Sequence, residues 1–227
     1  MPTKTYGQMC PLARSLDILG ERWTLLVIRE LLLGPKRFKY LLKTFPSLGA
    51  NRLAARLHGL EDAGIVRKAV LPEPAGVAVY ELTPLGEGLR TPLTALGLWG
   101  LALPIDERID PATTRADLIA MSLAATQTEP IDCARVESLQ FDVGVEIVHL
   151  QRRDGRFLAR SGPSLSPPSL QVACDLPTFM ALALRELTPA HALEQGRLSI
   201  LAGTLSALEE LFDVLGYVAP AAAAATA

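Results

Sequence analysis

The sequence predicts two domains of different fold class: an N-terminal winged helix-turn-helix, mainly α with a β-hairpin wing, and a C-terminal α+β domain. Helical periodicity dominates residues 11–63, and a two-stranded pattern follows it. From about residue 116 to 216, alternating strand patterns are interleaved with helices. Between the two regions, Pro104 and Pro111 bracket a charged run. This segment is the predicted boundary between the two domains.

The charge is distributed unevenly over the 227 residues. The chain carries a formal net charge of −2, but residues 1–100 carry +5 and the remainder −7. At roughly 100–200 residues per domain, the length permits two domains. An apolar content of 49% excludes intrinsic disorder. The basic half is therefore a candidate for binding a polyanion.

Several classes of protein are not expected. Residues 91–105, the longest apolar uncharged stretch, are shorter than the ~20 residues of a membrane span, and residues 1–8 lack the apolar core of a signal peptide. We expect a cytoplasmic protein that does not bind membranes. The three cysteines and three histidines are too dispersed for a disulfide framework or a metal site. No phosphate loop or nucleophile elbow is present, so neither an enzyme nor a cofactor is expected.

The N-terminal half divides into elements at its glycines and prolines. Four helices are predicted, over residues 11–19, 21–33, 38–45 and 48–63. Strands 65–71 and 77–82, joined by residues 72–76, form a hairpin. Thr83 and Pro84 then begin a single trailing helix that reaches Trp99. Three short helices with tight turns indicate a helix-turn-helix core, and the hairpin is its wing.

The fourth helix is predicted to contact the bases of DNA. Leu53, Leu57 and Leu60 form its buried stripe, so Asn51 and Arg52 face outward, where Asn can pair with adenine and Arg with guanine. Cations before this helix are placed to contact phosphates. The predicted DNA-binding residues are Lys36, Arg37, Lys39, Ser47, Gly49, Ala50, Asn51, Arg52 and Arg56. In isolation, each of these polar side chains is equally explained as an ordinary solvated residue.

Six motifs in order resemble the HxlR-type winged helix-turn-helix regulators of bacteria: Cys10-Pro11-Leu12, Leu19 to Leu32, Gly34 to Phe38, Leu53 to Leu57, Leu60 to Val66 and Tyr80 to Gly86. The resemblance covers about residues 7–103. It implies a homodimer on a palindromic operator in double-stranded DNA, with candidate interface residues Leu12, Leu16, Leu93 and Trp99, each of which can equally be core. The wing departs from the family because residues 72–76 contain Glu73 and no basic residue.

The resemblance also implies a role for Cys10, which matches a cysteine that some members use to sense oxidants or electrophiles. A helix N-terminus stabilises a thiolate. A structural cysteine is the alternative at this position.

The C-terminal half contains a predicted helix over residues 116–125 and a half-buried strand in which Phe141, Val143, Val145 and Ile147 alternate with polar residues. Asp154-Gly155 predicts a hairpin turn. Further strands lie near residues 170–174 and 198–200, with helices after Asp175 and Thr188, and a capping box at Ser206 to Glu209 begins the last helix.

This order of elements resembles the sterol carrier protein fold over about residues 113–216, which implies an apolar tunnel for a hydrophobic small molecule. The candidate lining residues are Phe141, Val145, Phe157, Val172, Phe179, Met180, Leu184, Leu201 and Phe212. The alternative is that each of them is an ordinary residue of the hydrophobic core. Arg152, Arg153, Arg156 and Arg160 cluster around the hairpin turn, where they can hold an anion or simply be solvated.

The predicted domains are residues 1–104, a linker over 105–115, the sterol-carrier-like domain over 116–216 and an alanine-rich tail over 217–227. The predicted function is that of a dimeric transcriptional regulator that responds to a hydrophobic ligand. The alternative is a lipid or metabolite carrier whose winged helix serves as an interaction module. The operator, the sign of regulation and the ligand do not follow from the sequence.

Overall fold

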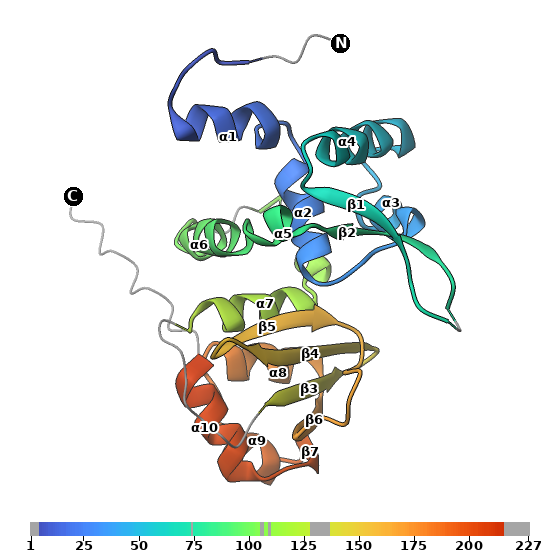
Figure 1. Ribbon diagram of the computed structural model, residues 1–227. Helices are drawn as coiled ribbons and strands as arrows, with labels where there is room; N and C mark the ends of the chain where they lie inside the picture. The colour runs from blue at the N-terminus through green and yellow to red at the C-terminus, as the bar shows by residue number, and fades with distance from the viewer. Residues whose placement is uncertain (1–4, 74, 105–106, 109, 128–136, 216–227) are drawn as a thin grey trace, which may run out of the picture. The chain divides into compact units, whose positions relative to one another are not determined.

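The computed structural model describes residues 5–73, 75–104, 107–108, 110–127 and 137–215 (Figure 1). By their contacts, the residues fall into two compact units, Met1–Leu93 and Thr94–Ala227, called here the N-terminal and C-terminal units. The predicted alanine-rich tail, part of the predicted linker and Cys133 lie outside the described residues.

The N-terminal unit contains the four predicted helices: α1 (Pro11–Leu19), α2 (Thr24–Leu32), α3 (Phe38–Thr44) and α4 (Ala50–Asp62). The second helix begins later than predicted because Trp23, at its N-cap, has a left-handed backbone with φ of 78°. Such a conformation is uncommon for a non-glycine residue. It separates α1 from α2 by a sharp turn.

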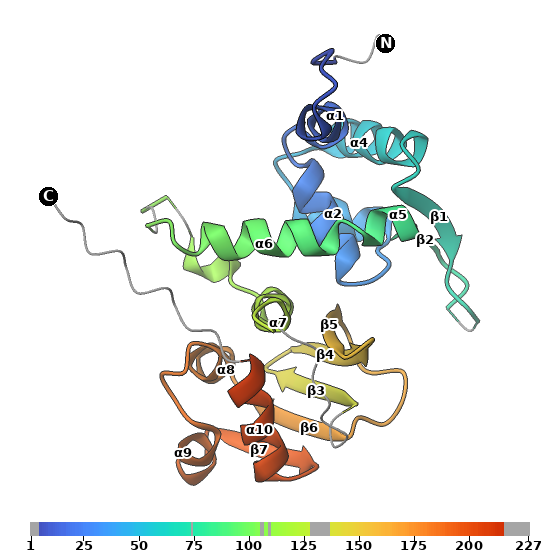
Figure 2. The ribbon, with the colours of Figure 1, turned by 60° about the vertical axis from the view of Figure 1, so that its left-hand side comes forward.

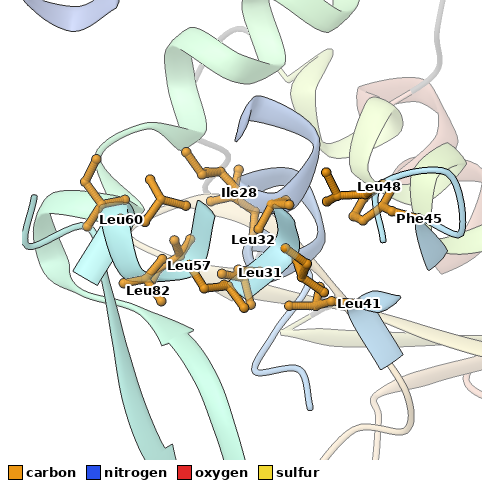
Figure 3. Close-up of a cluster of buried hydrophobic side chains, with 13 residues drawn as sticks. Ile28, Leu31, Leu32, Leu41, Phe45, Leu48, Leu57, Leu60 and Leu82 are labelled. Carbon is orange, nitrogen blue, oxygen red and sulfur yellow. The ribbon is translucent and has the colours of Figure 1, made fainter. Parts of the chain in front are cut away.

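A single apolar cluster holds these helices together (Figure 3). Helix α2 supplies Ile28, Leu31 and Leu32, and α4 supplies Leu57 and Leu60, all of them at most 2% exposed. Burying a side chain of this size contributes about 1.5–3 kcal/mol. The cluster therefore fixes the orientation of α4, and with it the face that α4 presents to solvent.

The predicted wing is confirmed as an antiparallel pair, β1 (Val66–Val70) and β2 (Ala78–Leu82). The single trailing helix predicted after it is wrong, because the chain forms α5 (Pro84–Glu87) and then α6 (Arg90–Gly100). Pro92 explains the break. In one continuous helix its ring would meet the carbonyl of Gly88 and its missing N–H would leave that carbonyl unbonded, whereas a proline is tolerated in the first turn of α6.

The start of α5 is anchored to the residues that precede the wing. The Thr83 hydroxyl donates to the Gly64 carbonyl at 2.6 Å and accepts from the Gly86 amide at 3.2 Å. The Thr83 amide donates to the Ile65 carbonyl at 2.9 Å. These bonds bring Gly86 so close to Ile65 that a Cβ at this glycine would lie 2.2 Å from the Ile65 carbonyl oxygen.

The C-terminal unit is an α+β fold, as predicted. After a 3₁₀ turn at Pro111–Thr113, its elements are α7 (Ala116–Ala125), β3 (Ser138–Val143), β4 (Glu146–Arg153), β5 (Arg156–Ser161), β6 (Leu170–Cys174), α8 (Leu176–Ala183), α9 (Pro189–Glu194), β7 (Leu198–Ala202) and α10 (Leu205–Leu215). The hairpin turn predicted at Asp154-Gly155 is confirmed, and both residues have positive φ. Asp-Gly favours this two-residue turn.

The single strand predicted over residues 141–147 is wrong. A two-residue turn at Gly144 and Val145 ends β3 and begins β4, so that Val143 pairs with Glu146. Gly144 has φ of 59°, which glycine adopts without steric cost. Val145, predicted to be half-buried, is instead fully exposed at the tip of this hairpin.

The five strands have the order β5-β4-β3-β6-β7, in which only β3 and β6 are parallel neighbours. The inner face of this sheet is covered by helices (Figure 2). Phe141 on β3 contacts Phe179 of α8 and Phe212 of α10, with ring centroids 4.6 and 6.1 Å apart. Ser161 at the end of β5 donates to Asp117 of α7 at 2.7 Å.

The opposite, outer face of the sheet is crossed by residues 162–169, called here the strap, because the chain must pass β4 and β3 to reach β6. Side chains of β4 and β3 are among the groups that hold the strap to this face. His149 Nδ1 donates to the Gly162 carbonyl at 2.8 Å, and the Ser164 amide donates to Gln140 Oε1 at 3.1 Å.

Side-chain caps begin the helices of this unit. Asp175 accepts from the Thr178 amide at 2.8 Å and begins α8, and Thr188 begins α9, as predicted. The bonds to Thr178 lower the pKa of Asp175, while burial raises the pKa of the neighbouring Cys174 thiol to about 12. The capping box predicted at Ser206 is wrong, because Thr204 accepts from the Ala207 amide at 3.2 Å and α10 begins at Leu205.

Candidate nucleic-acid interface

Helix α4 presents a polar face to solvent, as its sequence predicts. Leu53, Leu57 and Leu60 are buried, whereas Asn51 and Arg52 are exposed. Within the described part of the chain, neither of these two side chains has a hydrogen-bond or ion-pair partner. Both are therefore available to a ligand in solution.

The N-terminus of α4 is open. Gly49 precedes the helix with φ of 74°, and no side chain caps the first turn. A shallow depression of about 300 Å³ lies here, lined by Leu48, Gly49, Ala50, Asn51 and Arg52. Unpaired amides at a helix N-terminus favour an anion such as a phosphate. A Cβ at Gly49 would meet nothing within 4 Å, so its left-handed backbone, and not crowding, calls for glycine.

Arg56, which is also predicted to bind DNA, already contacts a carboxylate. Its guanidinium lies 3.5 Å from Glu21, its side chain is 26% exposed, and its Nε atom is buried without a partner. It thus contacts the segment before α2, and its contact with DNA stays a prediction.

The cations before α4 fall into two groups. Arg37, Lys39 and Lys43 are exposed, and so is Ser47 between α3 and α4. Lys36, in contrast, is only 8% exposed. Its backbone pairs with Tyr80 of the wing, and its ammonium group lies 5.0 Å from the centre of the Tyr40 ring. Burial does not support the predicted phosphate contact of Lys36, and we leave it out of the interface.

The cations of the wing are paired with carboxylates. Arg67 lies 2.7 Å from Glu81, and the ammonium group of Lys68 lies 3.3 Å from Glu61. Both cations belong to β1, away from the tip that contains Glu73. The wing therefore contributes little positive charge to a DNA surface.

The predicted interface helices carry exposed apolar side chains. Leu12 and Leu16 of α1 are 67% and 39% exposed, and Trp99 of α6 is 63% exposed. Helix α6 has no buried residue along its eleven positions. Leu93 differs, because it is partly buried and packs against the core of the N-terminal unit. Cys10 is exposed at the N-cap of α1.

The predicted tunnel residues of the C-terminal unit are divided between core and surface. Those that are buried are Phe141, Phe157, Val172, Phe179 and Phe212. Since Phe141 contacts Phe179 and Phe212, these rings fill the space between the sheet and its helices. The other four do not lie in an enclosed cavity: Val145 is fully exposed, and Leu201, Met180 and Leu184 are 56%, 42% and 38% exposed.

Two kinds of feature are absent from the described residues. No helix there is long and apolar enough to cross a membrane. No group of three or more His, Cys, Asp or Glu side chains among them is arranged to hold a metal ion.

The N-terminal unit, with its buried helical core, exposed polar helix and β-hairpin, is a winged helix-turn-helix of the DNA-binding class. The HxlR-like helix-turn-helix family matches residues 18–105. The HTH-type transcriptional regulator YodB of Bacillus subtilis (strain 168) is 37% identical over 107 residues, which make up 47% of this chain and 91% of YodB. The regulator YvaP of the same strain is 35% identical over 107 residues, 47% of this chain and 94% of YvaP.

A solved structure of quinone-bound YodB is 36% identical in sequence, with a TM-score of 0.36, and covers 40% of this chain and 97% of that one. From its sequence relatives, the chain belongs to the HxlR-like helix-turn-helix family.

Proposed function

We propose that the protein is a homodimeric regulator that inserts α4 of each protomer into the major groove of a palindromic operator. The observation that carries this proposal is the pair Asn51 and Arg52. Both are exposed and have no partner among the described residues, and the opposite face of their helix is fixed in the core. Exposed Arg37 and Lys39 before α4, with Ser47, Gly49 and Ala50 at its N-terminus, complete the proposed contact to the phosphates.

The dimer is supported by the apolar surface of α1 and α6. Large apolar side chains exposed on a protein surface are candidates for an interaction site, and Leu12 and Leu16 of α1 and Trp99 of α6 are each exposed. A sterol-carrier-like fold for the C-terminal unit remains part of the proposal. It is supported by the succession of α7, β3 to β6, α8, α9, β7 and α10. We keep its predicted limits of 116–216, with 1–104 as the DNA-binding domain, 105–115 as the linker and 217–227 as the tail.

Binding to the DNA upstream of the protein's own gene tests this function. Because Lys and Arg release counterions from DNA, a dimer that neutralises about six phosphates should lose roughly 1,000-fold in affinity between about 50 and 200 mM salt. The measurement is fluorescence anisotropy with the full chain at several salt concentrations. If no sequence-selective complex forms, the alternative of a carrier with an interaction module replaces the regulator, and the weakly charged wing already favours that alternative.

Cys10 is the proposed site of a redox or electrophile response. Its thiol is exposed at the start of α1, a helix assigned to the dimer interface, so that a bulky adduct there would alter how two protomers pack. YodB, to which this chain is similar, has been solved with a quinone bound.

Alkylation of the reduced protein tests the role of Cys10. We expect modification to lower operator affinity in the native chain and to leave it unchanged in Cys10→Ser, measured by anisotropy, with mass spectrometry to locate the adduct. Cys174, whose thiol is held protonated by burial, should remain unmodified. An alkylated Cys10 with unaltered operator affinity would exclude the sensor.

A further inference from the structure

Arg56 and Arg52 are neighbours on α4, because residues four apart lie on the same side of a helix. Arg56 lies between Arg52 and the buried stripe of this helix. From such a position a long arginine side chain can extend toward the outer face that carries Arg52 or toward the segment before α2. In the structure it extends toward that segment, where Glu21 accepts a hydrogen bond from it.

The contact between Arg56 and Glu21 is weak. Nη2 of Arg56 lies 3.5 Å from Oε2 of Glu21, which is longer than a usual hydrogen bond, and the Glu21 side chain is 60% exposed. Nε of Arg56 is buried and has no partner in the part of the chain that the structure describes. A buried donor without an acceptor is costly. The guanidinium can therefore gain by moving to a ligand that satisfies more of its five donors.

The segment that contains Glu21 is held in place by its neighbours. The ring of Trp23, whose backbone is left-handed, packs against that of Phe45 in the core, with the ring centroids 5.8 Å apart. The Thr24 amide donates to the Glu21 carbonyl at 3.1 Å. Because the Glu21 backbone is fixed in this way, Arg56 separates from the carboxylate when it turns toward a ligand on the outer face of α4.

A phosphate is a better partner for Arg56 than this carboxylate. Arginine can bind a phosphate through two parallel hydrogen bonds, whereas the bond to Glu21 is single and long. Since two anions repel each other, a phosphate beside α4 and the Glu21 carboxylate compete for the same guanidinium. The loss of the contact with Glu21 is then included in the free energy of binding DNA.

We propose that Glu21 is a positioning residue, which holds the guanidinium of Arg56 against the segment before α2 until a phosphate of the DNA backbone displaces it. The inference rests on the proposed function of α4. Because the new partner is a phosphate and not a base, Glu21 lowers the affinity for every DNA sequence by the same factor. Arg52, which has no partner among the described residues, is not restrained in this way.

The test is a double-mutant cycle of Glu21→Gln and Arg56→Met in the full chain, with fluorescence anisotropy on operator and unrelated duplex DNA. Methionine keeps an unbranched apolar stem and removes the guanidinium. Glu21→Gln should bind both duplexes more tightly. Its gain should be about 1.5- to fivefold larger per protomer with Arg56 than with Arg56→Met, the range of an exposed ion pair. Arg56→Met alone should make the salt dependence shallower by about 0.9 per protomer.

Glu61→Gln is the matched control for Glu21→Gln. Glu61 is a carboxylate of α4 itself and lies 3.3 Å from the ammonium group of Lys68. Its replacement should therefore have the same effect on DNA affinity with Arg56 and with Arg56→Met. Two-dimensional NMR of the Arg56 Nε–H group follows the displacement directly, and its resonance should shift when duplex DNA is added to the native chain.

The outcomes separate this inference from the proposed function. A gain from Glu21→Gln that is absent, or that is as large with Arg56→Met as with Arg56, would overturn the inference, because Glu21 would then act only by repelling DNA or not at all. An Nε–H resonance that stays in place would overturn it too. A native chain that binds operator and unrelated DNA alike would refute the operator and leave the role of Glu21 intact, whereas one that binds neither would refute both.

Discussion

Arg52→Ala is expected to weaken operator binding by about 1–3 kcal/mol for each half-site, because a bidentate arginine–guanine pair discriminates by that amount. A dimer places two copies on a palindrome, so the total cost is about 2–6 kcal/mol when separated positions add. The structure supports this expectation because the side chain of Arg52 is exposed and has no partner in the part of the chain that is described. Fluorescence anisotropy at a fixed salt concentration measures it.

Single-base variants of the operator show whether Arg52 contacts one particular base pair. With Arg52→Ala, replacing the base pair that Arg52 reads should cost nothing further, while other replacements keep their native penalties. Lys39→Ala should instead weaken all DNA sequences alike and make the salt dependence shallower. Arg153→Ala, which removes an exposed guanidinium from the C-terminal unit, is the matched control. A uniform loss over all sequences with Arg52→Ala would assign Arg52 to a phosphate and not to a base.

Gly86→Ala is expected to destabilise the N-terminal unit by about 3 kcal/mol, at the upper end of the usual cost of overpacking. The added Cβ would lie 2.2 Å from the Ile65 carbonyl oxygen and 3.0 Å from Leu82 Cδ2. The backbone oxygen cannot rotate away, because it accepts from the Thr83 amide. Relief therefore requires α5 to separate from the base of the wing. Urea unfolding, followed by the fluorescence of Trp23 at one protein concentration, gives the change in free energy.

Gly59→Ala is the matched control for Gly86→Ala. Gly59 is exposed in α4, and a Cβ there would meet nothing within 4 Å. Alanine should stabilise the helix by about 1 kcal/mol, since glycine is that much less favourable in a helix interior. The two glycine-to-alanine substitutions are thus expected to change the free energy of unfolding in opposite directions. If Gly86→Ala were as stable as the native chain, Gly86 would not lie as close to the Ile65 carbonyl as described.

The elements of the N-terminal unit could be predicted closely because local signals mark their ends. Gly34-Pro35, Pro46 and Gly64 each end a helix near the predicted residue. The break before α6 was missed because the signal, Pro92, acts on a carbonyl four residues earlier. The late start of α2 was missed because nothing in the residue type of Trp23 predicts a left-handed backbone.

The turn that separates β3 from β4 was missed although its pattern is present. In a hairpin with a two-residue turn, the buried positions change from odd to even numbers, as they do from Phe141 and Val143 to Val148 and Leu150. A single alternating strand pattern continued through Gly144 predicts a half-buried Val145, whereas this residue lies exposed in the turn. The burial of Lys36 and the position of the Arg56 guanidinium could not be predicted at all, since both depend on segments that meet only in the folded chain.

The parallel pairing of β3 with β6 is the pairing in the sheet that closes a long loop of chain. Strands β3, β4 and β5 meet through two-residue turns, and such hairpins close within about 1–10 μs. Val143 and Cys174, by contrast, are neighbours only after the whole hairpin pair and the strap have been spanned. The entropy of closing that long loop is lost before its contacts form. Forming the three-stranded meander therefore costs less chain entropy than joining β6, and with it β7, to its edge.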